Sequence, residues 1–303
     1  MIILNTKRAL SNLYLFTASF IWGTAFVAQR VGMDDVGPFT FCASRYFIGS
    51  VVIFIVAVLS DMRSGMSLAG AEMAAEWRSS LKGGLACGIA LFLASSMQQV
   101  GMQYTGAGKA GFITTLYIVF VPIIGLLMGK RSGLLKWLAV VMSLCGLYLL
   151  SVKDGFTIEL GDAILIVSSL FWSAHILSCN HFTKDGDPLK LSCIQFAVPC
   201  VMSLIAMSIS ESPTAESLRG AMWPIFYVGF ISTGIAFTCQ MAGQKYADPV
   251  NASLIMSLES IFAVLAGYFL LQETFTMREI VGCVLMFVAV VISQLPQKNE
   301  AYL

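Results

Sequence analysis

The sequence predicts an all-α integral membrane protein with ten transmembrane helices, arranged as two inverted five-helix repeats. Three observations favour this fold: an apolar composition, apolar segments of membrane-spanning length, and a second half that repeats the first. Of the 303 residues, 57% are hydrophobic and 12% are charged, and the mean hydropathy is +0.82. A soluble domain is usually about a quarter charged. Polar residues are therefore too few to cover a surface in water, and the chain is expected to lie in a membrane.

Each apolar segment has about the 20 residues that a helix needs to cross a hydrocarbon core of ~30 Å. The ten segments run over Leu10–Val31, Pro38–Ser60, Leu81–Met102, Ala107–Met128, Leu134–Ser151, Gly161–Asn180, Pro188–Ser210, Gly220–Gln244, Pro249–Leu271 and Thr276–Gln294. Most connections are short and carry turn residues, such as Gly37–Pro38 and Asp248–Pro249. The longest connection, from Asp61 to Ser80, mixes charged residues with alanines and Trp77. It is expected to form a short amphipathic helix on the membrane surface.

The second half of the chain repeats the first. At a shift of about 142 residues, identical residues align; the pairs are Gln98 with Gln240, Tyr104 with Tyr246, Ala110 with Ala252, Leu116 with Leu258 and Phe120 with Phe262. Near a shift of about 150, Trp22 aligns with Trp172 and Pro38 with Pro188. The two repeats are therefore predicted to cover residues 1–152 and 153–303, with five spans each. Because five is odd, equivalent helices cross the membrane in opposite directions, which is an inverted-topology repeat.

The distribution of positive charge predicts the orientation. About twelve Lys and Arg residues flank the spans on the side of the N-terminus and about four flank them on the other side, so the positive-inside rule places both termini in the cytoplasm. The net charge of +1 argues against nucleic acid as a partner, because binding phosphate needs a basic surface.

Four stretches resemble the EamA family of the drug/metabolite transporter superfamily: FIWGTAFVAQR at 20–30, SRYFIG at 44–49, GKAGFITTLYIVFVP at 108–122 and SLESIFAVLAGYFLLQE at 257–273. The resemblance implies ten helices in two inverted repeats and a central cavity lined mainly by helices 1, 3, 4, 6, 8 and 9. It also implies export of amino acids or other metabolites, or carriage of sugars or nucleotide sugars as in relatives, and a place in a bacterial inner membrane. The family often has proline directly after the glutamate of helix 9, whereas here Ser260 follows Glu259.

Polar residues in the middle of spans are the candidate site, because polar groups in hydrocarbon are costly and usually face a cavity. Glu259 lies about 10 residues into its helix, near the midplane, and is the first candidate for a protonatable group or a contact with a cationic substrate. The alternative is a buried carboxylate hydrogen-bonded to a neighbouring helix. Tyr117 holds the equivalent position in the fourth span, so the two residues are expected to flank the pseudo-axis, and ordinary aromatic packing is the alternative for Tyr117.

Six further residues complete the predicted substrate site, and four of them have a structural alternative. They are Gln98 and Gln240 as amide contacts, Trp22 and Trp172 as aromatic walls, His175 as a proton relay, and Lys109 as an anion contact or gate. The alternatives are packing for the tryptophans and the histidine, and snorkelling to the interface for Lys109. Arg45 is expected to be a structural pair or an interfacial anchor, because the resemblance makes its helix peripheral.

Enzyme, metal and cofactor signatures are absent from the sequence. It has two histidines, His175 and His181, no HExxH, no cluster of cysteines and no P-loop, so no catalytic residue, metal or cofactor is expected. The expected function is secondary transport of a small organic metabolite, such as an amino acid, a related metabolite or an amphipathic drug. Alternating access is the expected mechanism and efflux the favoured direction.

Several alternatives stay open. An uncoupled facilitator and an importer of sugar- or nucleotide-type metabolites are the first, and a membrane-embedded lipid enzyme or a sensor is less favoured. The expected partners are the small-molecule substrate, membrane lipid and, as a coupling ion, protons. The chain is expected to act as a monomer or a homodimer.

Overall fold

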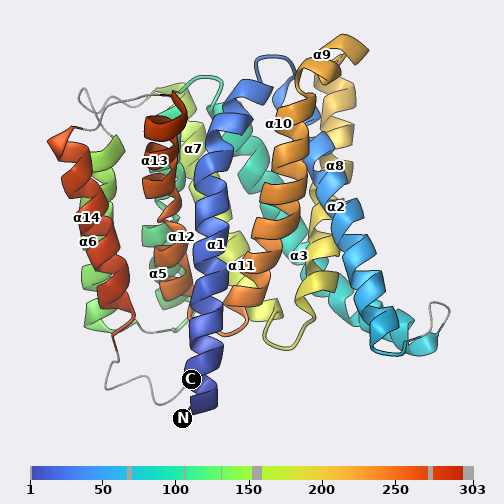
Figure 1. The fold of residues 1–303 in the computed structure, drawn as a ribbon, viewed down its shortest axis with the longest axis horizontal. Coiled ribbons are helices and arrows are strands. Elements are labelled where there is room, and N and C mark those ends of the chain that lie inside the picture. The colour runs from blue at the N-terminus through green and yellow to red at the C-terminus, as the bar shows by residue number, and fades with distance from the viewer. Residues whose placement is uncertain are drawn as a thin grey trace.

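The structure, a computed structural model, describes residues 2–66, 70–105, 107–130, 132–151, 159–271 and 276–295 (Figure 1). This part of the chain is helical throughout and contains no strand. The helices are α1 Ile2–Gly32, α2 Pro38–Arg63, α3 Ala71–Gly101, α4 Ala107–Thr114, α5 Tyr117–Leu127, α6 Leu134–Ser151, α7 Leu160–Phe182, α8 Pro188–Ser210, α9 Ala215–Gly220, α10 Met222–Tyr227, the π-helix η1 Val228–Ala236, α11 Phe237–Gln244, α12 Pro249–Met256, α13 Glu259–Leu271 and α14 Met277–Ser293. The predicted boundary between residues 152 and 153 lies outside the described residues.

Eight helical segments in the described part are long and apolar enough to cross a membrane, which makes this a multi-pass membrane protein. They run over Thr6–Gly32, Pro38–Arg63, Ala71–Gly101, Lys109–Leu127, Leu160–Phe182, Pro188–Ser210, Met222–Gln244 and Pro249–Ala266. The two other predicted spans correspond to α6, whose apolar core is Leu134–Leu150, and α14, both of which are shorter. A count of ten spans stays a prediction.

The connection between α2 and α3 differs from the expectation. No separate surface helix forms at 71–80, because α3 begins at Ala71 and continues without a break to Gly101. The charged residues of this region serve to bind α8 instead. The ammonium of Lys190, which is buried, lies 2.9 Å from Asp61 and also pairs with Glu76.

Several helices begin at the predicted turns, where side chains satisfy the free N–H groups of the first turn. Pro38, Pro188 and Pro249 each open a helix, and Asp187 and Asp248 accept backbone N–H groups of the helices that follow them. The start of α2 has Gly37 as its cap, without a side-chain oxygen. The carboxylate of Glu211, from the second half, accepts the N–H groups of residues 39 and 40 at 2.8 Å instead.

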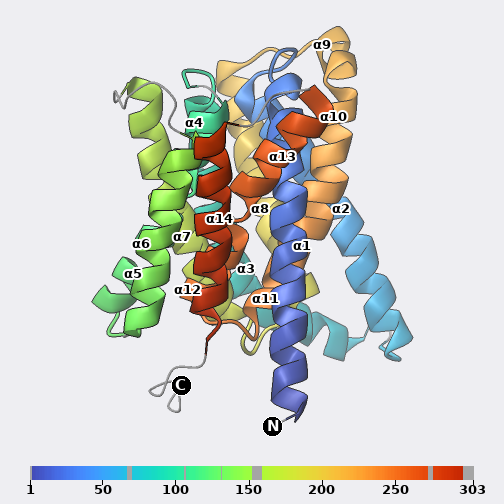
Figure 2. The same cartoon turned by 60° about the vertical axis from the view of Figure 1, so that its left-hand side comes forward.

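Contacts between the two halves follow an exchange of equivalent helices. Two helices meet their own equivalents: α2 packs on α8, and α6 packs on α14 (Figures 1 and 2). The contact of α3 with α7 also has an equivalent, in which η1 and α11 pack on α1. Where α6 meets α14, a Cβ on Gly146 would lie 2.7 Å from the carbonyl oxygen of Gly282, so only glycine permits this approach. This pattern is the one that two structurally equivalent halves produce around a pseudo-two-fold axis.

Both ends of the bundle can be followed through contacts. The guanidinium of Arg8 donates to the carbonyl of Gln294 at 3.0 Å, so the start of α1 meets the end of α14. At the opposite end, Arg30 near the end of α1 donates to the carbonyl of Met102 at 3.2 Å. Three residues further along the chain, the Thr105 hydroxyl donates to Asp162 in the first turn of α7. The end of α1 and the start of its equivalent α7 therefore lie at the same end of the bundle (Figure 1).

Two predicted single spans are each divided in the middle. α4 ends at Thr114 and α5 begins at Tyr117, while α12 ends at Met256 and α13 begins at Glu259. At each division a hydroxyl bonds a carbonyl of the preceding turn: Thr115 to Gly111 O at 2.8 Å and Ser257 to Leu254 O at 2.7 Å. Such bonds compete with the helix ladder and bend helices, which gives both divisions the same physical cause without a proline at the division itself.

Candidate functional site

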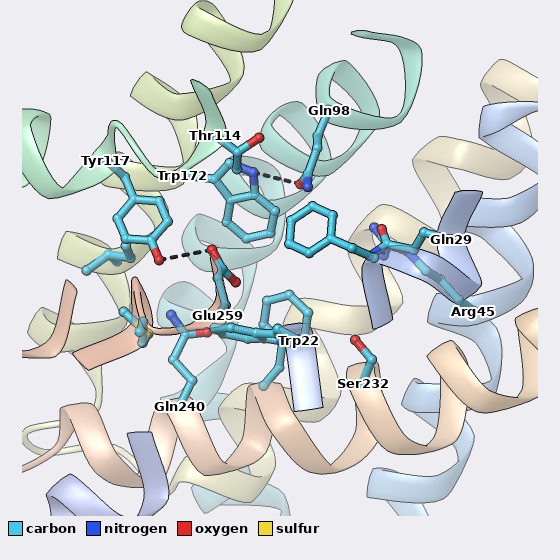
Figure 3. A pocket seen from close by; sticks show the side chains of 14 residues that line it. Trp22, Gln29, Arg45, Gln98, Thr114, Tyr117, Trp172, Ser232, Gln240 and Glu259 are labelled. Atoms are coloured by element: carbon cyan, nitrogen blue, oxygen red, sulfur yellow. Dashed lines mark hydrogen bonds between the residues drawn. The ribbon is translucent and has the colours of Figure 1, made fainter. Parts of the chain in front are cut away.

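A cavity lies between the two halves, at the level of the divided helices (Figure 3). It contains about 510 Å³ of empty space, part of which is open to solvent. The lining residues are Trp22, Phe26, Gln29, Arg45, Gln98, Thr114, Tyr117, Trp172, Ile176, Ser232, Phe237, Gln240, Met256 and Glu259. Apolar and aromatic walls with a few convergent polar groups are typical of sites for small organic ligands.

Glu259 and Tyr117 form the polar centre of this cavity. Each is the first residue after a helix division, and the Tyr117 hydroxyl donates to Oε1 of Glu259 at 3.1 Å. Glu259 as a whole is 6% exposed, and its carboxyl group has no ion pair in the described part of the chain. A second bond joins the two divisions beside it, between the hydroxyls of Thr115 and Ser260 at 3.2 Å. Glu259 and Tyr117, which the sequence predicts to flank the pseudo-axis, are thus in direct contact.

Helix α1 approaches Glu259 closely because it carries glycine at the point of contact. A Cβ on Gly23 would lie 2.7 Å from the carbonyl oxygen of Glu259 and 2.4 Å from the Cβ of Phe262. One residue before it, Trp22 faces the cavity. The absence of a side chain at position 23 thus lets α1 bring an aromatic wall beside the divided helix.

The aromatic wall consists of Trp22, Trp172 and Phe237. The rings of Trp22 and Phe237 are 4.8 Å apart, and those of Trp172 and Phe237 stack at 6.0 Å. Phe237 directly follows the π-helix η1, in which Ser232 also faces the cavity. A π-helical segment inside an α-helix widens the turn and is frequent at functional sites.

The two glutamines have different partners. Trp172 Nε1 donates to Oε1 of Gln98 at 3.0 Å, so a residue of the second half bonds one of the first (Figure 3). The equivalent pair is Trp22 and Gln240, and both Trp22 Nε1 and Gln240 Oε1 are buried without a hydrogen-bond partner in the described residues. One of two equivalent bonds is therefore formed and the other is not.

Six of the eight predicted site residues line the cavity, and His175 and Lys109 do not. His175 is fully buried behind Trp172, where its Nε2 lies 3.0 Å from Oε1 of Gln195. Lys109 forms an ion pair of 2.6 Å with Asp162, which joins α4 to α7. Substrate contact by either residue stays a prediction.

Sequence reasoning missed Gln29 and Arg45 as lining residues. Arg45, expected as a structural pair or an anchor at the membrane surface, is 4% exposed and faces the cavity. The signal for Gln29 was its spacing: Trp22, Phe26 and Gln29 follow one another at i, i+4 and i+7, which places them on one face of α1. No comparable stripe marks Arg45, whose exposure depends on how α2 packs against α1 and η1.

Comparison with known proteins agrees with this architecture. The sequence profile of the EamA-like transporter family matches residues 9–152 and 159–294. An uncharacterized transporter of Archaeoglobus fulgidus is 30% identical over 296 residues, which cover 95% of this chain and 87% of that protein. The uncharacterized transporter YoaV of Bacillus subtilis is 26% identical over 280 residues, covering 90% and 92%.

A crystal structure with 17% sequence identity matches 94% of this chain and 96% of its own with a TM-score of 0.73, which supports the fold. Together, the cavity between two repeated halves, the matching profile and the relatives lead to one conclusion: the chain belongs to the EamA-like transporter family of the drug/metabolite transporter superfamily.

Proposed function

We propose that this chain is a secondary transporter that moves a small organic metabolite through the cavity by alternating access, with Glu259 as its coupling group. In this proposal α6 and α14 also cross the membrane, which gives ten spans in two inverted repeats. The positive charge on the side of the N-terminus favours cytoplasmic termini in a cell inner membrane, and efflux is the favoured direction.

The buried Glu259–Tyr117 pair is the observation that carries the proposal. An isolated charge is expensive in a low-dielectric interior, so a carboxyl group there is normally paired, neutralised or functional. The Tyr117 hydroxyl is a neutral partner, and Glu259 lines the cavity, where its carboxyl group can meet a proton or a cationic group of the substrate. A proton that is exchanged for substrate at this carboxyl group couples transport to the proton gradient.

The unequal Trp–Gln pairs supply a structural basis for two states. In an inverted repeat, exchanging the conformations of the two halves converts a state that is open to one side of the membrane into a state that is open to the other side. Trp172 bonded to Gln98, with Trp22 and Gln240 unbonded, describes one state. The other state then has Trp22 bonded to Gln240 and the first bond broken.

Replacement of Glu259 by Gln in proteoliposomes tests the proposal. Gln keeps the size and can accept the Tyr117 hydroxyl but cannot exchange a proton, so flux driven by a pH gradient should fall at least tenfold while exchange without a gradient persists. Glu216→Gln, on the exposed helix α9, is the matched control and should leave flux unchanged. The substrate for the assay is selected by thermal-shift screening of amino acids, nucleosides and cationic drugs.

Two outcomes decide between the proposal and its alternatives. Gradient-driven flux that survives Glu259→Gln removes Glu259 as the coupling group. Flux through the natural protein that ignores the pH gradient, and is carried by substrate concentration alone, identifies the uncoupled facilitator.

A further inference from the structure

We infer that Arg45 and Gln29 form a subsite for an anionic group, so that the transported molecule carries a carboxylate at one end. This inference rests on the proposed function, because it assigns part of the same cavity. It names the substrate's chemistry, which the Glu259 site alone leaves open.

Arg45 is a buried cation without an anion. The residue is 4% exposed, and no carboxylate forms an ion pair with it in the described part of the chain. Nη1 donates to Oε1 of Gln29 at 3.2 Å, and Nη2 donates to the Tyr46 hydroxyl at 3.1 Å and to Cys42 Sγ at 3.8 Å. These acceptors are neutral, and the Tyr46 ring, 4.6 Å from the guanidinium carbon, adds only a cation–π contact.

The guanidinium still has donors to offer. It carries five N–H groups, and the three bonds above leave Nε–H and one N–H of Nη1. Nε is buried and has no hydrogen-bond partner in the described residues. Because arginine stays charged and a buried unpaired charge is costly, an anion that enters the cavity would offset the cost of this charge.

The positions of the charged groups define the shape of the ligand. In Figure 3, Gln29 and Arg45 lie at one end of the cavity and Tyr117 and Glu259 at the other, with the tryptophan rings between them. A planar carboxylate fits the planar donors of arginine, and the rings suit an apolar or aromatic body. The Glu259 end then receives either an ammonium group, when the substrate is a zwitterion, or the coupling proton, when it is a simple carboxylic acid.

Binding of matched pairs of compounds to purified protein tests the subsite. The probes are benzoate with benzamide, 3-phenylpropionate with its amide, and phenylalanine with its amide, because each pair differs only in the anionic charge. Quenching of tryptophan fluorescence reports occupancy, since Trp22 and Trp172 line the cavity. We expect at least one carboxylate to bind about tenfold or more tightly than its amide, as loss of a charge-assisted bond predicts.

Variants separate a binding role from a structural one. Arg45→Gln should abolish the preference for carboxylate over amide, and Arg45→Lys, which keeps the charge without the planar fork, should retain part of it. Arg30→Gln removes an exposed arginine next to Gln29 in sequence but outside the cavity lining, and should leave the preference intact. Size-exclusion profiles and melting curves establish that each variant is folded.

The inference and the proposed function fail in different ways. If no pair shows a preference for carboxylate in the natural protein, or if Arg45→Lys and Arg45→Gln both keep it, the subsite is wrong while transport of neutral or cationic compounds still supports the function. If no compound is transported at all, the function itself fails. Phenylalanine binding that is lost in Glu259→Gln, with 3-phenylpropionate binding kept, identifies a zwitterionic substrate; the reverse selectivity overturns the arrangement of the two ends.

Discussion

Replacing Gly23 by Ala perturbs the contact between α1 and the divided helix, and the geometry sets the size of the effect. A Cβ at this position would lie 2.4 Å from the Cβ of Phe262, 2.7 Å from the carbonyl oxygen of Glu259 and 2.8 Å from the backbone nitrogen of Ala263. Carbon atoms pack at about 3.5–4.0 Å. Two of the three neighbours are backbone atoms that no side-chain rotation can move, so α1 and α13 must separate by about 1 Å.

The cost follows from two opposing effects. Overpacking of an interior site costs about 1–3 kcal/mol, and alanine regains about 0.8–1 kcal/mol over glycine in a helix. The free energy of unfolding should therefore fall by up to about 2 kcal/mol. Because the carbonyl that must move belongs to Glu259, the hydrogen bond to Tyr117 should lengthen, and gradient-driven flux should fall together with stability.

Gly111→Ala is the matched control, because a Cβ there meets nothing within 4 Å. Only the helix preference for alanine applies, so its stability should be unchanged or higher by about 1 kcal/mol. Thermal unfolding of both variants in one detergent, followed by tryptophan fluorescence, measures the difference. Equal melting temperatures for Gly23→Ala and Gly111→Ala would refute the close approach of α1 to the divided helix.

Two further predictions concern contacts between the halves. Trp172→Phe breaks the bond to Gln98 and should shift the balance of states by about 2- to 10-fold towards the state in which Trp22 bonds Gln240. Trp22→Phe removes an unbonded N–H and should favour the state of this structure. Spin-label distances between α1 and α7 measure the balance, and the same response in both variants would contradict this prediction. Lys109→Met leaves Asp162 without its cation and should lower the free energy of unfolding by about 1.5–3 kcal/mol. Adding Asp162→Asn should recover part of that loss, which a double-mutant cycle in the same detergent measures.

Identical residues that recur at nearly constant spacing predict the repeat, and the family profile matches the chain twice, over residues 9–152 and 159–294. A residue near a pseudo-two-fold axis would meet its own equivalent, and the aligned residues Tyr117 and Glu259 are in contact. Helix divisions at the same level were not predictable. They rest on the hydroxyls of Thr115 and Ser257, and most serines and threonines in helices make such bonds without dividing the helix.

Residue type alone does not decide which polar side chains of the spans line the cavity. His175 and Lys109 are rare polar residues in apolar spans, yet their partners, Gln195 and Asp162, lie on other helices and draw them away from the cavity. Arg45 was assigned to the periphery because its helix was, although one face of a peripheral helix still points inward. Tertiary packing decides these cases, and the sequence of a single helix carries little of that information.

In the proposed mechanism of alternating access between inverted halves, the two kinds of contact between the halves would have different consequences. A contact on the pseudo-axis, such as Tyr117 with Glu259, maps onto itself when the halves exchange conformations, so it is kept in both states. Contacts away from the axis come in equivalent pairs, such as Trp172 with Gln98 and Trp22 with Gln240, and the exchange forms one as it breaks the other. A coupling group must meet substrate from both sides of the membrane, and the axis is the place where a single side chain meets that requirement. The chemical difference between tyrosine and glutamate at equivalent positions therefore gives this axis one acid and one neutral partner, instead of two carboxylates that would repel each other.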